Sequence, residues 1–285
     1  MKPFNSKIPF LLAISFVLTA CSSIVRHPEV DGVKKIAIIS LYTNQDIPKV
    51  GGGGSNGGGA AAFGKILKAA KGDESEVKPE EMNNRERLAK YALERYHAAL
   101  SKVPGWRVVP MDAVIGSKDY RAMGKVETEN STLAALGSFA TAVQQSAYNT
   151  PSKMWAMPFG KENTHTDPKK LAALCAKLGV DAVAVIEVDL GYDSSFAVLG
   201  NGSAVASVAS ATKVINKNGE FAVYFPDIAK AGTGRPRFES EKKMLMLGGK
   251  VFITGDTEVA FRQGIEQAAE STAQVITEGL VVAKK

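Results

Sequence analysis

Hydrophobic positions recur along the chain at two spacings, which predict strands and helices in alternation. A continuous apolar run at 34–42 predicts a buried strand, and positions three and four residues apart at 79–103 predict a long helix. Pro104-Gly105 ends that helix, a short strand is expected at 106–110, and a helical turn at 111–116. This strand, helix, strand order favours parallel pairing of the two strands.

The second half of the chain predicts one more helix, an antiparallel meander and a closing helix. Asp167-Pro168 supplies an N-cap and a proline at the first helical position, and Gly179 ends this helix. Strands are expected at 181–190, 203–215 and 220–225, with turns at Asn201-Gly202 and Asn218-Gly219, and Asp256 is expected to cap the last helix. The predicted class is α+β: a mixed sheet with one parallel βαβ part and an antiparallel three-stranded meander, with helices packed on the sheet.

Three segments lack this regularity. The first is the glycine-rich stretch 51–59, which predicts a loop and is followed by a small basic amphipathic helix expected at 60–71. Residues 117–166 are expected to form an irregular insertion, although 133–148 has helical spacing. The stretch 226–250, rich in glycine, proline and basic residues, predicts another loop.

The amino terminus carries an export signal. Lys2 and Lys7 form a positively charged region before an apolar run of about 11 residues. This run is shorter than the ~20 apolar residues that a helix needs to cross a bilayer. The closing residues Leu18-Thr19-Ala20-Cys21 resemble the lipobox of bacterial lipoproteins. An ordinary cleaved signal followed by a chance cysteine is the alternative.

The lipobox resemblance implies cleavage after Ala20, a diacylglycerol on the Cys21 sulfur, and acylation of the new amine by a chain such as palmitate. Ser22 after the cysteine implies transport to the outer membrane. Several acyl chains would anchor the protein durably. The expected organisation is a signal peptide at 1–20, a lipidated tether at 21–33, and a single α+β domain at 34–285 that faces the periplasm.

Two short motifs add a second resemblance. Leu178-Gly179-Val180-Asp181-Ala182 precedes a predicted strand, and Asn218-Gly219-Glu220 lies between two. With the order of elements over 34–280, they resemble a superfamily of curli-secretion lipoproteins, outer-membrane lipoproteins that activate penicillin-binding proteins, and the amino-terminal domain of TolB. The resemblance implies the fold, and work at envelope machinery, but no chemistry.

Charge and cysteine content narrow the partners. The formal net charge is +6, and loss of Lys2 and Lys7 with the signal would leave +4, spread diffusely. Such a diffuse charge excludes a nucleic-acid groove, which needs clustered arginines and aromatic residues. Acylation of Cys21 would leave Cys175 without a disulfide partner.

No catalytic set emerges from the sequence. The stretch from Gly59 to Lys65 has P-loop spacing, but Ile66 stands where a hydroxyl should bind magnesium. His27, His97 and His165 lack metal-ligand spacing, and Cys175 shares an apolar helix face with three leucines. The carboxylates Glu187, Asp189 and Asp193 are typical of a solvated strand face. We therefore expect no cofactor, no metal and no enzyme activity, with a hydrolase hidden in 117–166 as one alternative.

Two segments are candidate binding surfaces. Phe63, Lys65 and Lys68 could place helix 60–71 on a membrane or a partner, or the helix could pack on the sheet. Arg235 and Arg237, near Phe238, Met244 and Met246, suit a partner or a glycan, or belong to a solvated loop.

The function predicted from sequence is that of a non-enzymatic binding or adaptor lipoprotein of the outer membrane. Its partners would be the bilayer, through Cys21, and an envelope protein, while self-association stays open. The alternative is an oligomeric secretion channel of the curli-exporter type.

Overall fold

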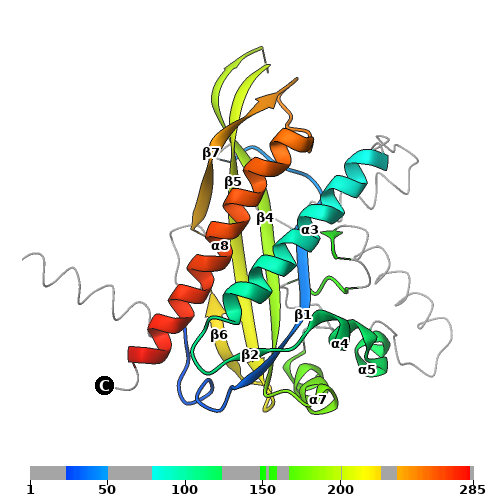
Figure 1. Cartoon of the computed structure of the whole chain (residues 1–285), viewed down its shortest axis with the longest axis vertical. Helices are drawn as coiled ribbons and strands as arrows, with labels where there is room; N and C mark the ends of the chain where they lie inside the picture. Colours follow the sequence, from blue (N-terminus) through cyan, green and yellow to red (C-terminus); the bar gives the residue numbers. More distant parts are fainter. Residues whose placement is uncertain are drawn as a thin grey trace, which may run out of the picture.

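A mixed β-sheet forms the centre of the protein (Figure 1). The computed structural model describes residues 24–50, 79–123, 148–151, 154–158, 167–199, 201–225 and 236–282, without the side chains of 79–83 and 195–197. Within these residues the sheet has seven strands in the order β2-β1-β4-β5-β6, with β3 beside β1 and β7 beside β5. The strands are β1 (Lys35–Asn44), β2 (Arg107–Val108), β3 (Tyr148–Asn149), β4 (Ala182–Val198), β5 (Asn201–Asn216), β6 (Phe221–Phe225) and β7 (Arg237–Met246).

Strand pairing is parallel on one side of the sheet and antiparallel on the other. β1 pairs in parallel with both β2 and β4. β4 and β5 are antiparallel over almost their whole length, from Ala182 opposite Asn216 to Val198 opposite Asn201. β6 and β7 both pair antiparallel with β5, β6 near its carboxyl end and β7 near its amino end. The predicted βαβ part and three-stranded meander are therefore both present.

Helices cover both faces of the sheet (Figure 1). α3 (Pro79–Leu100) and α8 (Gly255–Val282) pack on one face, where Leu88, Tyr96 and Phe261 belong to the larger hydrophobic core. α4 (Met111–Gly116), α5 (Lys118–Ala122) and α7 (Pro168–Leu178) lie on the other face around a smaller core. α8 approaches β5 closely at Gly264, where an added Cβ would lie 2.6 Å from the Val208 Cγ2.

The local signals behind the predicted turns are confirmed. Asp167 accepts a hydrogen bond from the Lys169 N–H at the start of α7, and Gly179 ends that helix in the left-handed region with φ of 61°. Gly219 (φ +83°) closes the hairpin between β5 and β6, where the Asn216 side chain accepts hydrogen bonds from two backbone N–H groups. Both superfamily-like motifs thus perform the backbone roles expected of them.

Two predicted turns are wrong in position. β4 and β5 pair up to Val198 opposite Asn201, so Asn201-Gly202 begins β5 rather than forming the turn. β4 and β5 extend farther than predicted because small and polar residues continue their pairing beyond the apolar stretch. α8 begins at Gly255, and its first turn is closed by Thr257, whose Oγ1 accepts a hydrogen bond from the Thr254 N–H at 2.6 Å, so Asp256 is not the cap.

The loop predicted at 226–250 is wrong for residues 237–246, which form β7. Met244 and Met246 face the core, but Ser240, also buried, interrupts the apolar alternation that would have revealed a strand. Ser240 lies at an irregularity in the pairing, where its Oγ accepts a hydrogen bond from the Ala206 N–H at 3.0 Å. The polar side chain therefore replaces a missing bond of the ladder.

The insertion 117–166 is only partly described. It contains α5 and β3, neither of which the sequence predicted, and Met154, Ala156 and Met157 are buried although 154–158 has no regular structure. Tyr120 connects these parts: its hydroxyl donates to the Ile39 carbonyl at 2.7 Å and accepts from the Trp155 N–H at 2.9 Å. The predicted helices at 60–71 and, up to residue 147, at 133–148 lie outside the described residues.

We expect Tyr120→Phe to lower the free energy of unfolding by about 2 kcal/mol, because it leaves two buried backbone groups unpaired. Tyr96→Phe is the matched control. The Tyr96 hydroxyl is equally buried beside Ser210 and Thr272, but no hydrogen bond of acceptable geometry reaches it from the described residues. Urea denaturation of both variants measures the difference, and equal losses would contradict the bridging role of Tyr120.

Candidate functional site

The described chain begins as an extra strand-like segment at the outer edge of β6. The Arg26 N–H donates to the Ala222 carbonyl, and the Tyr224 N–H donates to the Ile24 carbonyl, each at 2.9 Å. Val25 is fully buried and packs on α8 at Gly279, where an added Cβ would lie 2.4 Å from its Cγ2. The segment predicted as a tether therefore belongs to the folded body from Ile24 onward.

This packing leaves a very short link to the predicted lipid site. Only Ser22 and Ser23 separate Cys21 from Ile24. Because an extended chain spans at most ~3.6 Å per residue, the Cα of Cys21 lies within about 11 Å of the Cα of Ile24. Lipid on Cys21, which itself lies outside the described residues, would hold this end of the sheet against the membrane.

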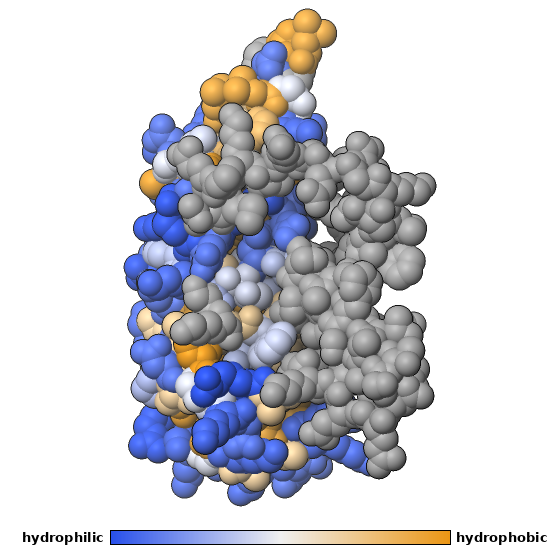
Figure 2. Space-filling model, turned by 90° about the vertical axis from the view of Figure 1, so that its right-hand side faces the viewer, coloured by the Kyte–Doolittle hydropathy of each residue, from blue (hydrophilic) through white to orange (hydrophobic). Residues whose placement is uncertain are grey.

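An apolar tip stands at the other end of the sheet. We define it as Val198, Leu199, Leu245 and Leu247, which are exposed by 57%, 96%, 65% and 49%. Figure 2 shows hydrophobic residues gathered at the projecting end of the molecule, where β4 and β5 meet and β7 ends (Figures 1 and 2). Isolated exposed leucines are ordinary, but adjacent ones at one projecting end are not.

Strand register brings these side chains together. Val198 pairs with Asn201, and Leu245 pairs with Ser203, so both side chains point to the sheet face that α3 and α8 do not cover. Leu247, two residues beyond Leu245, shares this face, whereas Met244 and Met246 point into the core. β7 is therefore apolar on both faces at this end.

Leu199 occupies an unfavourable backbone conformation. Its φ of 50° lies in the left-handed region, which glycine and asparagine tolerate and leucine does not. At 96% exposure its side chain gains nothing from packing in return. Neither backbone geometry nor packing in the core explains a leucine here. Residues held in unfavourable backbone conformations are concentrated at sites where a protein binds something.

The second turn of the tip is built from glycines. Gly248 and Gly249 have φ of 57° and 72°, and Leu247 and Lys250 exchange two backbone hydrogen bonds of 3.0 Å around them. The Asn201 Oδ1 accepts from the Gly248 N–H at 2.9 Å, and the Tyr192 hydroxyl donates to the Gly249 carbonyl. The backbone groups of Leu247 and Lys250, the Gly248 N–H and the Gly249 carbonyl are therefore paired within the protein.

Lysines lie at the outer end of the tip, while one exposed acidic side chain, Asp193, lies on the same face in the row of Lys243, because both residues pair with Val205. The stretches 194–205 and 243–255 contain Lys243 and Lys250 and no acidic residue. Lys243 pairs with Val205 and Lys250 forms a bridge with Leu247, so register places both lysines on the face of the apolar side chains. The candidate site thus combines exposed aliphatic side chains with two cations.

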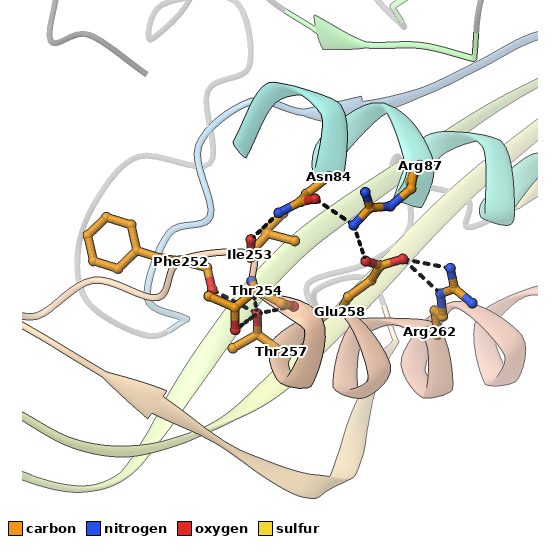
Figure 3. A network of polar contacts seen from close by, with 8 residues as sticks. All are labelled: Asn84, Arg87, Phe252, Ile253, Thr254, Thr257, Glu258 and Arg262. Atoms are coloured by element: carbon orange, nitrogen blue, oxygen red, sulfur yellow. Dashed lines mark hydrogen bonds and ion pairs between the residues drawn. The ribbon is translucent and has the colours of Figure 1, made fainter. Parts of the chain in front are cut away.

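A network of polar contacts fixes the base of the tip to the helices (Figure 3). The Asn84 side chain donates to the Ile253 carbonyl at 2.7 Å, and the Thr257 Oγ1 donates to the Phe252 carbonyl at 2.7 Å. Phe252 points away from the network and is 45% exposed. The chain between β7 and α8 is thereby bonded to both helices at two adjacent carbonyls just before α8 begins.

Glu258 lies at the centre of this network. Arg87 donates to its Oε2 at 2.9 Å, and Arg262 donates to its Oε1 at 2.6 Å, while its side chain is only 8% exposed. Burial by itself raises the pKa of this carboxyl, but the hydrogen bonds from the two arginines lower the pKa by more, so that it lies below the ordinary value.

The other candidates from sequence do not converge on this site. Arg237 is exposed at the start of β7, far along the strand from the tip, and its guanidinium lies beside Gly191. His27 contacts Asp31 on the amino-terminal segment, and His97 is on α3. Phe63, Lys65, Lys68, His165, Arg235 and the P-loop-like stretch lie outside the described residues.

Two predictions about individual side chains can be compared with the structure. Cys175 is buried, and burial raises the pKa of its thiol to about 11, as expected of an inert cysteine. Glu187 and Asp189 share a face of β4 but are half-buried rather than fully solvated. Burial first, and then these two carboxylates, raise the pKa of Tyr148. Asp193 is exposed.

The described ranges hold no cluster of three or more His, Cys, Asp and Glu residues that could bind a metal ion. In the same ranges no helix is both long and apolar enough to cross a membrane. The apolar tip was missed in the sequence because Val198 and Leu199 lie between the predicted strand at 181–190 and the predicted turn at Asn201-Gly202, and the two other leucines lie in a predicted loop. The run Met244-Leu245-Met246-Leu247 was the available signal, since a strand with one buried face needs only every second residue apolar.

Gly279→Ala should release the amino-terminal segment, because the added methyl group overlaps Val25 and outweighs the helix propensity gain of about 1 kcal/mol. We expect tryptic cleavage after Arg26 to accelerate several-fold and the melting temperature to fall. Gly255→Ala, also in α8 but with open space around its Cβ, is the control. Equal protection of Arg26 in both variants would contradict the packing described here.

Glu258→Gln should lower the free energy of unfolding at pH 7 by about 1–2 kcal/mol, since two hydrogen bonds to a charged group are lost to partly exposed arginines. Because the folded pKa is depressed, the stabilisation by Glu258 exists above the ordinary glutamate pKa and disappears as pH falls through the folded value. Denaturation of both proteins at pH 7 and pH 3 should therefore give a gap that closes at the lower pH.

Comparison of the chain with protein-family models, with curated proteins and with solved structures found no match. The superfamily resemblance of Leu178–Ala182 and Asn218–Glu220 therefore stays a prediction. The function has to be inferred from the chain's own residues, of which the apolar tip and the amino-terminal segment are the most informative.

Proposed function

We propose that this chain is a lipid-anchored, non-enzymatic binding component of the bacterial cell envelope. Cys21 carries the lipid in the outer membrane, the folded body faces the periplasm, and the apolar tip is the binding surface. The lipobox-like sequence supports the anchor. The observation that carries the binding role is Leu199, a leucine exposed by 96% in a left-handed backbone conformation, at the same end of the sheet as exposed Val198, Leu245 and Leu247.

The positions of the two ends fit this role. The amino-terminal segment meets β6 at Val223, which pairs with Val214 of β5, and Val198 of the tip pairs with Asn201 of the same strand. The thirteen steps from Asn201 to Val214 span about 44 Å at the strand's rise per residue. An anchor within ~11 Å of Ile24 would leave the tip directed away from the membrane that holds it.

The anchor is tested by metabolic labelling with an alkyne analogue of palmitate. The chain has only two cysteines, so Cys175→Ala is the matched control for Cys21→Ala. We expect label and membrane association in the wild type and in Cys175→Ala, and neither in Cys21→Ala. Label that persists in Cys21→Ala, or a wild type without label, would overturn the proposed anchor.

The binding role is tested in cells with a photo-crosslinking residue at position 199. The control is the same residue at position 281, where the exposed Val281 lies at the carboxyl end of α8. We expect crosslinks specific to position 199. Equal products from both positions would contradict a binding role of the tip. Links from position 199 only to further copies of this chain, together with rings in electron micrographs, would replace the proposal with the oligomeric channel.

A further inference from the structure

We propose that the apolar tip inserts into an anionic lipid bilayer other than the one holding Cys21, so that the protein connects two membrane surfaces. The inference rests on the proposed lipid anchor at Cys21 and names what the tip binds. Four observations on the tip favour a bilayer over a protein partner.

The first observation is the size of the patch. The tip offers four aliphatic side chains, with Phe252 beside them on the chain leading to α8. A stable protein interface uses about 20–30 residues on each side. A bilayer needs no such area, because each apolar side chain that passes the headgroups gains independently of its neighbours.

The second observation is the kind of side chain. Binding energy between proteins is concentrated in tryptophan, tyrosine and arginine, with leucine and valine under-represented. The tip consists of valine and leucine only. Leucine and phenylalanine are the types that amphipathic surfaces bury at the boundary between headgroups and acyl chains.

The third observation is charge. Lys243 and Lys250 lie on the apolar face, and the stretches 194–205 and 243–255 carry no acidic residue. Exposed lysines beside inserted apolar side chains can reach anionic headgroups while their stems stay in apolar surroundings. Asp193, in the row of Lys243 on this face, partly offsets that lysine, so Lys250 at the outermost turn carries most of the attraction to a negatively charged lipid surface.

The fourth observation is the backbone. Surroundings without water accept only polar groups that are paired within the protein. At the glycine turn, Leu247 and Lys250 bond to each other, and Asn201 and Tyr192 satisfy Gly248 and Gly249. These bonded backbone groups can therefore enter the membrane interface already paired within the protein.

The geometry assigns the tip to a second bilayer. Tip and amino-terminal segment are about 44 Å apart along β5. They also differ in face: Val25 packs with α8 in the larger core, while Val198, Leu245 and Leu247 point to the opposite face of the sheet. A molecule that stands with its amino-terminal segment on the membrane holding Cys21 therefore presents the tip away from that membrane.

The test reconstitutes the full lipidated protein in fluorescent donor vesicles and adds heavy acceptor vesicles that contain no protein. Acceptors consist of phosphatidylethanolamine with phosphatidylglycerol, or of phosphatidylcholine alone, and donor fluorescence that sediments with them measures bridging. We expect bridging with the anionic acceptors that weakens at high salt, and little with phosphatidylcholine.

Variants of the tip separate insertion from other causes. Leu199→Asn combined with Leu245→Thr and Leu247→Thr should reduce bridging at least tenfold, and the fold should persist because these side chains are exposed and asparagine tolerates the left-handed conformation. Val259→Thr combined with Val281→Thr, two exposed valines outside the tip, is the control and should bridge like the wild type. Lys243→Gln with Lys250→Gln should weaken bridging and its dependence on salt.

Each contrary result is distinguishable. Protein that floats with donor vesicles but bridges to no acceptor, or a tip variant that bridges like the wild type, would overturn the insertion while leaving the proposed anchor intact. Bridging that requires protein in both vesicle populations would overturn it in favour of self-association. Failure of the wild type to enter donor vesicles would instead be the failure of the proposed lipid anchor.

Discussion

The long antiparallel pairing of β4 with β5 is the interaction on which the remaining structure depends. It runs in one direction from Ala182 opposite Asn216 to Val198 opposite Asn201, with one irregularity near Ser194. β1 adds to one side of this pair, and β6 and β7 add to the other at different heights. Because a shift of one residue would exchange the two faces of each strand, this register also decides which side chains meet α8 and which stay exposed.

The packing of α8 transmits this register to both ends of the molecule. Gly264 lets the helix approach Val208 of β5, and Gly279 makes room for Val25 beside β6. Near its other end, Glu258 and Thr257 hold Arg87 and the chain that leads from the tip. One helix thus contacts the amino-terminal segment and the segment that supports the tip, and both are placed relative to the same strand.

Much of the fold could be predicted because its signals are local. The N-cap at Asp167, the left-handed Gly179 and the Asn218-Gly219 turn each need only neighbouring residues to be understood. β7 could not be predicted in this way, since Ser240 is buried by a ladder bond to Ala206, a residue 34 positions away. The tip was hidden for the same reason: Val198 and Leu245 come to the same end and face of the sheet only through the register of three strands. The proposed lipid site at Cys21, in contrast, rests on sequence alone, because an export signal is a local pattern along the chain.

The attachment of the amino-terminal segment also determines how mechanical load would enter the protein. A pull on Cys21 would reach the body first at Ile24, whose carbonyl is bonded to the Tyr224 N–H, and then at Arg26, bonded to Ala222. These bonds belong to a short edge pairing, whereas the central strands share many bonds over their whole length. Tension between two attached surfaces would therefore detach the segment at 24–33 before it opened the sheet, and the weakest mechanical element would lie next to the anchor rather than at the tip.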